Sequence, residues 1–175
     1  IINDPKYNER AEIIREKGTN RSNFLRGQVD TYTWVDFGDS YLPSELNAAY
    51  LYPQLLKAQH MTQDRMNTWN AYYEAFKPLQ DAGRIDLPVI PADCEHNAHM
   101  FYIKCRDLAE RTDFIQFLRD NGVYSVFHYV PLHSAPAGLK FGRFDGEDVC
   151  TTAESDRLVR LPMYYGLNDS DRSRV

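Results

Sequence analysis

The chain has 175 residues, of which 43% are hydrophobic and 26% are charged. This composition is typical of a folded domain and excludes a chain that stays disordered. The formal net charge of −5 argues against a nucleic-acid binder, because such proteins normally carry a basic excess. No run approaches the ~20 apolar residues that a membrane helix needs, and the start lacks a signal segment. The sequence therefore predicts a cytoplasmic protein without nucleic-acid or membrane partners.

The cysteines and histidines do not form a recognisable metal motif. Cys94, Cys105 and Cys150 are odd in number and include no CxxC pair. Their spacing fits neither a zinc ribbon nor a disulfide framework, so we expect free thiols in a reducing compartment. The sequence has no HExxH motif and no Cys/His cluster, and we therefore predict no metal site.

The first third of the chain predicts two helices separated by a long loop. Residues 6–17 are compatible with a helix that Gly18 ends. Residues 18–43 show little periodicity but carry several aromatic side chains, which argues against a disordered linker. Loops of this length are uncommon inside compact domains, so we expect this one to be functional or to reach across an interface. Ser44 is suited to cap the next helix, which Pro53 should kink.

The middle of the chain predicts a long helix followed by a strand. The helix is expected to begin at Thr62 and to end near Gly83, with one apolar stripe packed into the core. That stripe consists of Met66, Trp69, Tyr73 and Phe76. Residues 99–105 alternate between two faces, which is typical of a strand.

The last third predicts a helix, a strand and another helix. Thr112 is placed to cap a short amphipathic helix that Gly122 ends, and residues 123–130 have the composition of a strand. A capping-box pattern at 151–154 precedes residues 155–162, which we expect to be helical. From about residue 62 onward, this order predicts an α+β layer, a small sheet covered by helices.

Both ends of the chain suggest an internal segment of a longer protein. The opening "IIND" has the pattern of the end of a strand whose beginning is missing. Near the other end, Asn168 could cap a helix, but only about one turn follows it, and a helix that short would not hold by itself.

Two segments carry side chains suited to binding. "KGTNRS" could hold an anion, because it offers a glycine, two hydroxyls, an amide and the guanidinium of Arg21. Its spacing alone favours a solvated polar loop. "VFHYVPLHSAP" contains His128 and His133, and the residues by themselves leave open a metal, a substrate or a buried hydrogen-bond partner for these imidazoles.

Longer blocks of the sequence resemble a known family. "GDSYLPSELNAAYLYPQL", "NAHMFYIK", "NGVYSVFHYVPLHSAPAG" and "RLVRLPMYYGL" follow the order found in nucleotide-sugar aminotransferases, and the matching blocks run from Asp4 to Leu167. These are pyridoxal-phosphate enzymes of the aspartate-aminotransferase-like fold, called fold type I. Within the family, residues 15–51 look most like enzymes that move an amino group from glutamate to C4 of dTDP-4-keto-6-deoxyglucose.

The resemblance divides the chain and leaves it without a catalytic residue. Residues 1–61 would be the end of the large cofactor-binding domain, and residues 62–175 a small α+β domain truncated at its end. The family's Schiff-base lysine would lie upstream of Ile1, since none of the six lysines present sits in its motif. The isolated segment is therefore expected to lack transaminase activity.

The resemblance also implies roles for individual residues. In family dimers the loop 18–43 would reach the neighbouring active site, where an Asn-Tyr-Arg pattern usually contacts the cofactor phosphate. Here Ser40, Tyr41 and Leu42 take those places. The Ser40 hydroxyl can replace an amide as a phosphate donor, but Leu42 cannot replace an arginine.

A second set of residues is expected to bind the dTDP-sugar or glutamate. It consists of Asn20, Arg21, His128, Tyr129 and His133. The histidines would position the sugar nucleotide without taking part in the chemistry, which is supplied by the cofactor and its lysine. Two alternatives are a transaminase for another nucleotide sugar and a non-catalytic binding or interaction domain that kept the fold.

Overall fold

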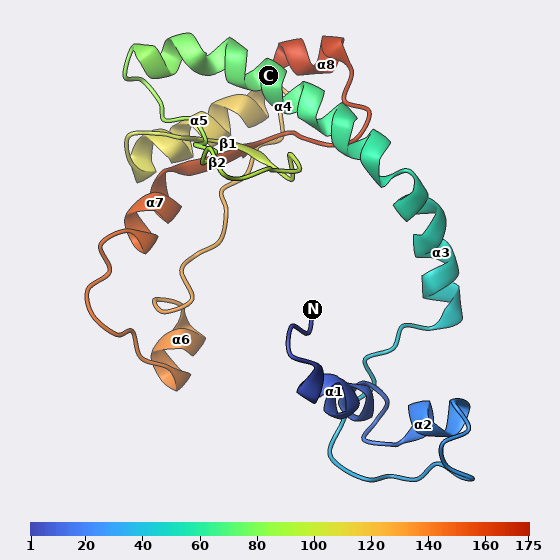
Figure 1. Cartoon of the computed structure of the whole chain (residues 1–175). Coiled ribbons are helices and arrows are strands. Elements are labelled where there is room, and N and C mark those ends of the chain that lie inside the picture. The colour runs from blue at the N-terminus through green and yellow to red at the C-terminus, as the bar shows by residue number, and fades with distance from the viewer. The chain divides into compact units, whose positions relative to one another are not determined.

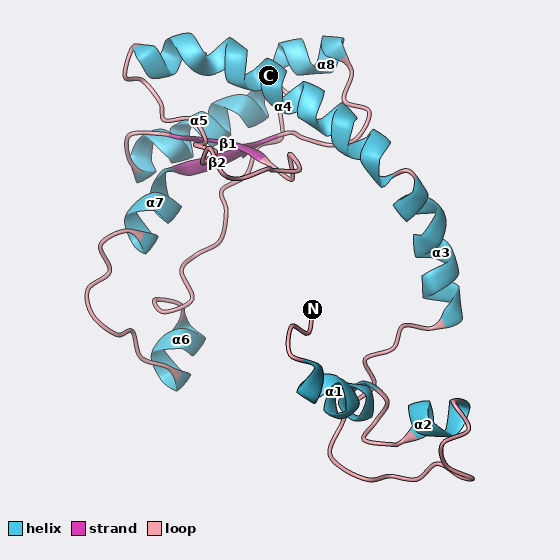
Figure 2. Cartoon of the chain, viewed as in Figure 1, coloured by secondary structure: helices cyan, strands magenta, loops and turns pink.

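Helices and short strands follow one another along the chain in a computed structural model that describes all residues, from Ile1 to Val175 (Figure 1). The chain divides into two units of consecutive residues, 1–56 and 57–175. The first unit is helical and irregular, and both paired strands belong to the second (Figure 2). None of the helices combines the length and apolar character needed to cross a membrane.

The first unit begins with a 3-10 turn, η1 (Pro5–Tyr7), and helix α1 (Asn8–Arg15). The predicted helix over 6–17 is therefore confirmed in its centre but ends earlier. Its last two residues leave the helical backbone, because Glu16 has φ −110° and ψ 51° and Lys17 has a positive φ of 62°. Positive φ is uncommon outside glycine, so this end of the helix is held by surrounding contacts.

The loop 18–43 contains more regular structure than its sequence predicts. It includes a short helix, α2 (Arg21–Leu25), and isolated antiparallel bridges at its two ends, Glu16 with Ser40 and Thr19 with Trp34. The next helix, α3 (Glu45–Leu56), has the predicted cap, because the Ser44 hydroxyl accepts from the amide of Asn47 at 3.2 Å. Pro53 lies inside α3.

The second unit opens with the long helix α4 (Ala58–Asp81), which begins four residues before the predicted start at Thr62. Strand β1 (Phe101–Lys104) and helix α5 (Leu108–Asp120) follow, then α6 (Pro136–Phe141), α7 (Thr151–Arg157), β2 (Leu158–Leu161) and α8 (Asp169–Arg174). Figure 2 shows β1 and β2 side by side. They pair antiparallel, with Phe101 opposite Leu161 and Lys104 opposite Leu158.

The core of this unit lies between α4, the two strands and α5. Phe101 and Val159 are fully buried on the sheet, and Trp69 and Tyr72 of α4 pack against Phe101 at ring separations of 5.4 and 5.3 Å. The predicted apolar stripe of α4 is thus confirmed, although it omitted Tyr72, whose hydroxyl donates to the carbonyl of Pro162 at 3.0 Å. Such aromatic pairs stabilise a core beyond their area alone.

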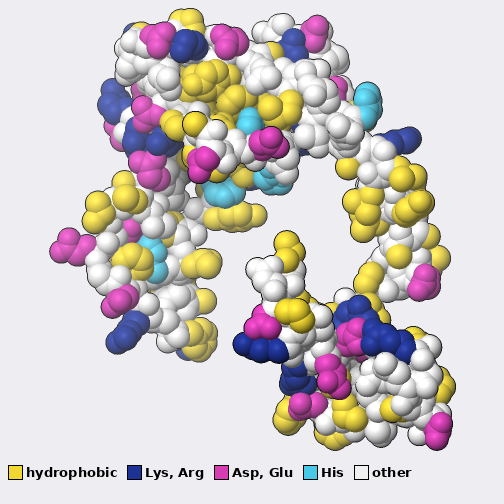
Figure 3. All heavy atoms as spheres, viewed as in Figure 1, with side chains coloured by type: hydrophobic (Ala, Val, Ile, Leu, Met, Phe, Trp, Pro, Cys, Tyr) yellow, Lys and Arg dark blue, Asp and Glu magenta, His cyan; other side chains and the backbone are white.

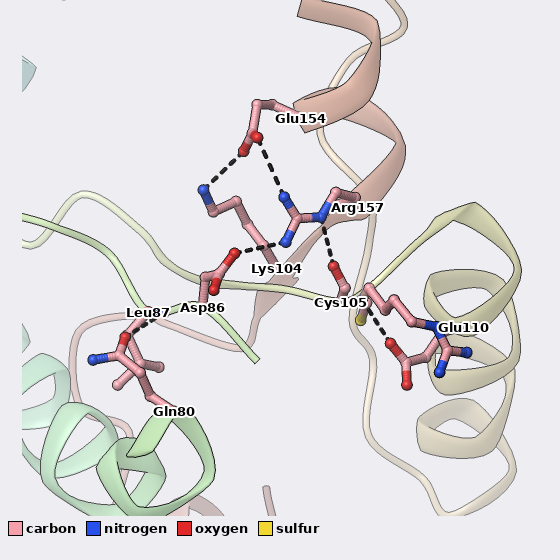
Figure 4. A network of polar contacts seen from close by, with 9 residues as sticks. Gln80, Asp86, Leu87, Lys104, Cys105, Glu110, Glu154 and Arg157 are labelled. Carbon is pink, nitrogen blue, oxygen red and sulfur yellow. Dashed lines mark hydrogen bonds and ion pairs between the residues drawn. The ribbon is translucent and has the colours of Figure 1, made fainter. Parts of the chain in front are cut away.

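Polar contacts connect the sheet to α7 (Figure 4). Arg157 donates to Asp86 at 2.6 Å, to Glu154 at 3.3 Å and to the Cys105 carbonyl at 2.8 Å, while Lys104 pairs with Glu154 at 2.8 Å. Each pair is partly exposed and contributes little alone, but the network joins segments distant in sequence. It therefore fixes the end of α7 against β1.

Three predictions about this unit were wrong. Thr112 lies inside α5, where its hydroxyl bonds to the Leu108 carbonyl, and the cap is Asp107, whose carboxylate accepts from the amide of Glu110 at 2.9 Å. Residues 123–130 form no strand and pair with the sheet through an isolated bridge between Val126 and Arg160. Of residues 155–162, which were predicted to be helical, only 155–157 belong to a helix, because α7 ends at Arg157 and residues 158–161 form β2.

The short helix α8 forms in spite of its length, so the expectation that it would not hold was also wrong. Its N-cap is Asn168, whose side-chain oxygen accepts from the amide of Asp171 at 2.9 Å. Val175 at its other end packs against the core. Capping and tertiary packing thus replace the length that an isolated helix would need.

Candidate functional site

The first unit contains a cavity of about 300 Å³ at the end of α1, called here the basic pocket. Its walls come from the α1 terminus and from both ends of the loop 18–43, and they consist of Arg15, Glu16, Lys17, Thr19, Arg21, Tyr32, Ser40 and Leu42. Three cationic side chains and one carboxylate thus line the same pocket. Figure 3 shows Lys and Arg side chains close to Asp and Glu side chains on the visible face of this unit.

Backbone pairing beside α1 builds the pocket. The amide of Lys17 donates to the carbonyl of Asp39 at 3.1 Å, and the amide of Tyr41 donates to the carbonyl of Arg15 at 3.2 Å. These bonds flank the bridge between Glu16 and Ser40. The returning end of the loop is therefore held against the residues that leave α1.

Gly18 makes this close approach possible. Its φ is +75°, and a Cβ atom there would lie 1.8 Å from the carbonyl oxygen of Asp36. No other residue could occupy this position without moving the backbone, since the contact would be far inside van der Waals distance. The glycine that was predicted to end the helix thus also closes the loop.

Glu16 is the most enclosed charged side chain of the basic pocket. The side chain is 8% exposed, and its Oε1 accepts from Arg15 at 3.0 Å and from the Ser22 hydroxyl at 3.3 Å. Its Oε2 is buried and has no hydrogen-bond partner. Buried polar atoms are almost always satisfied, so this oxygen is an exception among the polar atoms of the unit.

The structure brings together two of the four residues that were predicted to bind cofactor or substrate in this unit. Ser40 and Arg21 both line the basic pocket. Tyr41 is not part of its lining, and its side chain is exposed. The Asn20 side chain holds the loop instead, because its oxygen accepts from the amide of Thr33 at 2.8 Å.

In the second unit, His133 forms a polar cluster with a carboxylate. Its Nε2 lies 2.8 Å from Oδ2 of Asp148, and its ring lies against Phe144 at 4.3 Å. Asp148 also accepts from the hydroxyl and the amide of Thr152. The pKa of Asp148 is held below its ordinary value, first by the Thr152 hydroxyl and in smaller part by His133. The cluster connects the segment before α6 to the start of α7.

His128 and Tyr129 lie on the same segment. Their rings are 4.7 Å apart, and Nδ1 of His128 is buried without a partner. The Tyr129 ring is exposed, while its carbonyl accepts from the Ser155 hydroxyl at 2.7 Å. The structure brings no group of three or more His, Cys, Asp or Glu side chains into a metal-binding arrangement.

Sequence reasoning missed several residues of these sites. "KGTNRS" was considered as a possible anion site because of its hydroxyls and Arg21, but nothing in the sequence pattern singled out Arg15, Glu16 or Tyr32. Asp148 was missed as well, since no local spacing connects it to His133. Both cases are contacts between distant segments, which periodicity does not report.

Comparison with known proteins gives the class of this fold and then the family. The chain resembles the crystal structure of the aminotransferase TlmJ from Streptoalloteichus hindustanus, with a TM-score of 0.79 and 22% identity over 99% of this chain and 44% of that one. The fold is therefore the α+β C-terminal part of a fold-type I transferase. The model of the DegT/DnrJ/EryC1/StrS aminotransferase family matches residues 1–175, and the chain belongs to this family.

Two curated relatives act on dTDP-sugars according to their names. A dTDP-4-dehydro-2,3,6-trideoxy-D-glucose 4-aminotransferase of Saccharopolyspora spinosa is 24% identical over 96% of this chain and 43% of its own length. A dTDP-3-amino-3,4,6-trideoxy-alpha-D-glucose transaminase of Micromonospora megalomicea is 26% identical over 75% of this chain and 35% of its own length. The chain thus spans less than half the length of these relatives.

Pyridoxal phosphate is the cofactor of this family, whose structural neighbours include one enzyme in PLP and PMP forms. The donors of the basic pocket suit its phosphate group. Thr19 and Ser40 contribute hydroxyls, and three cationic side chains line the same pocket. Hydroxyls and cations are the groups that bind phosphate in proteins, so this chain's residues fit that end of the cofactor.

Proposed function

We propose that this chain is part of a pyridoxal-phosphate enzyme that moves an amino group from glutamate to C4 of dTDP-4-keto-6-deoxyglucose. The product would be dTDP-4-amino-4,6-dideoxygalactose, the amino sugar used for enterobacterial common antigen. The observation that carries the proposal is the basic pocket inside a chain that matches the aminotransferase family from end to end. The S. spinosa relative, named as a 4-aminotransferase of a dTDP-sugar, supports amination at C4.

In this proposal the first unit holds anions. The Ser40 hydroxyl would donate to the cofactor phosphate, with Tyr41 beside it. Arg21 would pair with a phosphate of the sugar nucleotide or a carboxylate of glutamate, because its planar guanidinium suits both. Leu42 lies in the same pocket as Arg15, Lys17 and Arg21, so the cation that Leu42 cannot provide has three substitutes nearby.

The second unit would provide one wall of the sugar site. His128, Tyr129 and His133 lie on one segment, and His133 is fixed by Asp148 and Phe144. A ring held on two sides loses little entropy when it contacts a ligand, which suits a positioning role. Asn20 would act indirectly, because its side chain already holds the loop. Pyridoxal phosphate, when bound, would supply the electron sink for amino transfer.

The proposal includes a homodimer in which the loop 18–43 reaches the neighbouring active site. It is supported by large apolar side chains that are exposed on this loop and on α3, among them Trp34, Phe37, Leu46 and Tyr50. Exposed apolar surface of this kind marks interfaces. The three free cysteines are consistent with a reducing compartment such as the cytoplasm.

The test is product analysis with the full-length enzyme, dTDP-4-keto-6-deoxyglucose and glutamate. NMR of the product should show the amine at C4 in the galacto configuration. The second candidate is a transaminase like the M. megalomicea relative, whose name places the amine at C3. Such an enzyme would leave the 4-keto sugar unchanged and would aminate a 3-keto dTDP-sugar offered in a parallel assay. A full-length protein that takes up pyridoxal phosphate but transfers no amino group to any nucleotide sugar would contradict both. The isolated segment 1–175 should show no turnover.

A further inference from the structure

A second cavity, called here the α4–α5 pocket, lies in the second unit and has no part in the proposed function. Its volume is about 370 Å³, and its walls come from the end of α4, the segment that follows it, β1 and the first half of α5. None of the residues proposed to bind cofactor or sugar nucleotide lines it. The lining residues are Phe76, Leu79, Arg84, Ile85, Ile103, Cys105, Glu110 and Phe114.

The walls of the α4–α5 pocket are mostly hydrocarbon. Ile103 is buried in the core, whereas Phe76, Ile85 and Phe114 are only partly buried and Leu79 is 44% exposed. An apolar group that covers such surface removes it from water, which is favourable. The volume also falls within the roughly 300–1,000 Å³ of small-molecule pockets, at their lower end. The pocket therefore suits the apolar part of a small ligand.

Backbone hydrogen bonds fix one wall of this pocket. The amide of Asp86 donates to the carbonyl of Lys104 at 3.0 Å, and the amide of Lys104 donates to the carbonyl of Asp86 at 2.9 Å. The amide of Arg84 donates to the carbonyl of Leu79 at 2.9 Å. Arg84 and Ile85 are thus attached on one side to α4 and on the other to β1. This wall is preformed, so a ligand would not have to order it.

The charged side chains at this pocket leave one cation without a partner. A polar cavity adjoins the α4–α5 pocket and shares Arg84 and Glu110 with it. Glu110 is already engaged, because its carboxylate accepts from the amide of Arg106 at 2.6 Å (Figure 4). The other three cations of the polar cavity each pair with a carboxylate at 2.6 to 3.0 Å, whereas Arg84 makes no ion pair; the paired cations are Lys104, Arg106 and Arg157.

An unpaired guanidinium beside an apolar cavity matches a ligand that has an apolar body and one anionic group. The planar guanidinium of arginine suits a carboxylate, and one cation balances its single charge. We propose that the α4–α5 pocket binds a small apolar carboxylate. Its chain or ring lies against Phe76, Leu79 and Phe114, and its carboxylate accepts hydrogen bonds from Arg84. This site is separate from the proposed sugar aminotransferase function and does not depend on it.

The test measures binding of three probes to the full-length holoenzyme by calorimetry. Octanoate has both an apolar chain and a carboxylate, octanol has the chain alone, and acetate has the charge alone. Octanoate should bind more tightly than either of the others. In Arg84→Ala its affinity should fall about three- to tenfold, because the lost contact is charge-assisted but partly exposed to water, while octanol should bind as before.

A second variant removes the apolar contact instead of the charge. Leu79→Gln should lower the affinities for octanoate and octanol by a similar factor, because both ligands lose the same hydrocarbon surface. Two control variants, Arg119→Ala and Leu139→Gln, change exposed side chains outside the pocket and should leave all three affinities unchanged. The melting temperature reports whether each variant is folded.

Three outcomes would overturn the inference. A wild-type enzyme that does not bind octanoate would show that the α4–α5 pocket takes no such ligand. Octanoate binding that neither Arg84→Ala nor Leu79→Gln weakens would place the ligand elsewhere. Equal losses of octanoate and octanol in Arg84→Ala would show that Arg84 shapes the pocket and does not bind the carboxylate. Amino transfer to the nucleotide sugar is measured in parallel, so failure of the proposed function is seen independently of octanoate binding.

Discussion

Glu16 and Ser40 face each other across an antiparallel bridge that joins the end of α1 to the end of the loop 18–43. One is a buried carboxylate, and the other is the hydroxyl that the family resemblance assigns to the cofactor phosphate. The bridge places both on the basic pocket, so acceptor and donor chemistry are combined at one site. The integrity of that site therefore depends on the backbone geometry beside the bridge.

Gly18→Ala should disrupt the basic pocket. The new methyl group would meet the Asp36 carbonyl at 1.8 Å, and the φ of +75° is unfavourable for alanine. Backbone strain of this kind costs about 1–3 kcal/mol before the steric clash is counted. We expect a lower melting temperature and loss of pyrophosphate binding, measured by calorimetry on the full-length enzyme.

Gly27→Ala is the matched control for this prediction. Gly27 also has a positive φ, +70°, but a Cβ atom there would have no neighbour within 4 Å. This variant should show the conformational strain alone and keep its affinity for pyrophosphate. Equal behaviour of the two variants would mean that the contact between Gly18 and Asp36 does not shape the pocket.

The strands show why part of the fold could be predicted and part could not. The alternation of Phe101, Ile103 and Cys105 with Tyr102 and Lys104 is local, and it correctly indicated β1. The run "LVRL" of β2 fits a helix as well as a strand. Its state depends on pairing with β1, which lies far away in sequence, and a short apolar run cannot show this.

The candidate sites show the same division. The residue types of "KGTNRS" suggested a possible anion site around Arg21, and Arg21 and Thr19 do line one pocket in the structure. Their contact with Ser40 could not be derived from spacing, because it depends on how the loop returns to α1. For the same reason the side chain of Asn20, predicted to meet substrate, holds the backbone of Thr33 instead. The residue types within a segment could be interpreted from the sequence, but contacts between distant segments could not.

Tyr72→Phe should destabilise the second unit. The Tyr72 ring is 2% exposed, its hydroxyl donates to Pro162, and burial raises the pKa of Tyr72 to about 12. Removing the donor leaves a carbonyl oxygen without its partner, which costs about 1–3 kcal/mol. Chemical denaturation followed by fluorescence should show this loss.

Tyr73→Phe serves as the comparison, because its ring stacks on Trp69 but its hydroxyl makes no hydrogen bond within the chain. The free energy of unfolding of this variant should stay within about 0.5 kcal/mol of the wild-type value. Equal stabilities of the Tyr72 and Tyr73 variants would contradict a stabilising role for the bond to Pro162.

The three cysteines should differ in their reactivity toward alkylating reagents. Cys94 and Cys150 are exposed, whereas Cys105 is buried and burial raises its pKa to about 11. Because the thiolate is the reactive form, Cys105 should stay unlabelled at pH 8 in peptide maps of the native enzyme, while the other two are modified. Labelling of Cys105 at a rate equal to that of Cys94 would show that this part of the core opens readily.

The raised pKa of Cys105 also makes the stability of the folded chain depend on pH. The folded state favours the neutral thiol, whose ordinary pKa is 9.0. The contribution of this thiol to the free energy of unfolding is therefore fully present below pH 9 and is lost as the pH rises toward 11. Cys105→Ala should flatten this part of the profile of melting temperature against pH, and an unchanged slope would contradict the assignment.

Arg21→Ala tests whether the basic pocket serves substrate. The exposed guanidinium of Arg21 lines this pocket, and a charge-assisted contact to a phosphate or carboxylate is worth about 1.5–3 kcal/mol. The KM of the full-length enzyme for the sugar nucleotide or for glutamate should therefore rise more than tenfold, with a smaller change in kcat. The substrate whose KM changes identifies the anion that Arg21 holds.

Arg119→Ala is the control for Arg21, because it removes an exposed arginine from α5, outside the basic pocket. It should leave both KM values unchanged. An Arg21 variant that behaves like this control would return Arg21 to the role of a solvated loop residue. Arg15 and Lys17 line the same cavity as Arg21. If the KM rises further in the double variant Arg21→Ala/Lys17→Ala than in Arg21→Ala alone, the two cations act on one anion together.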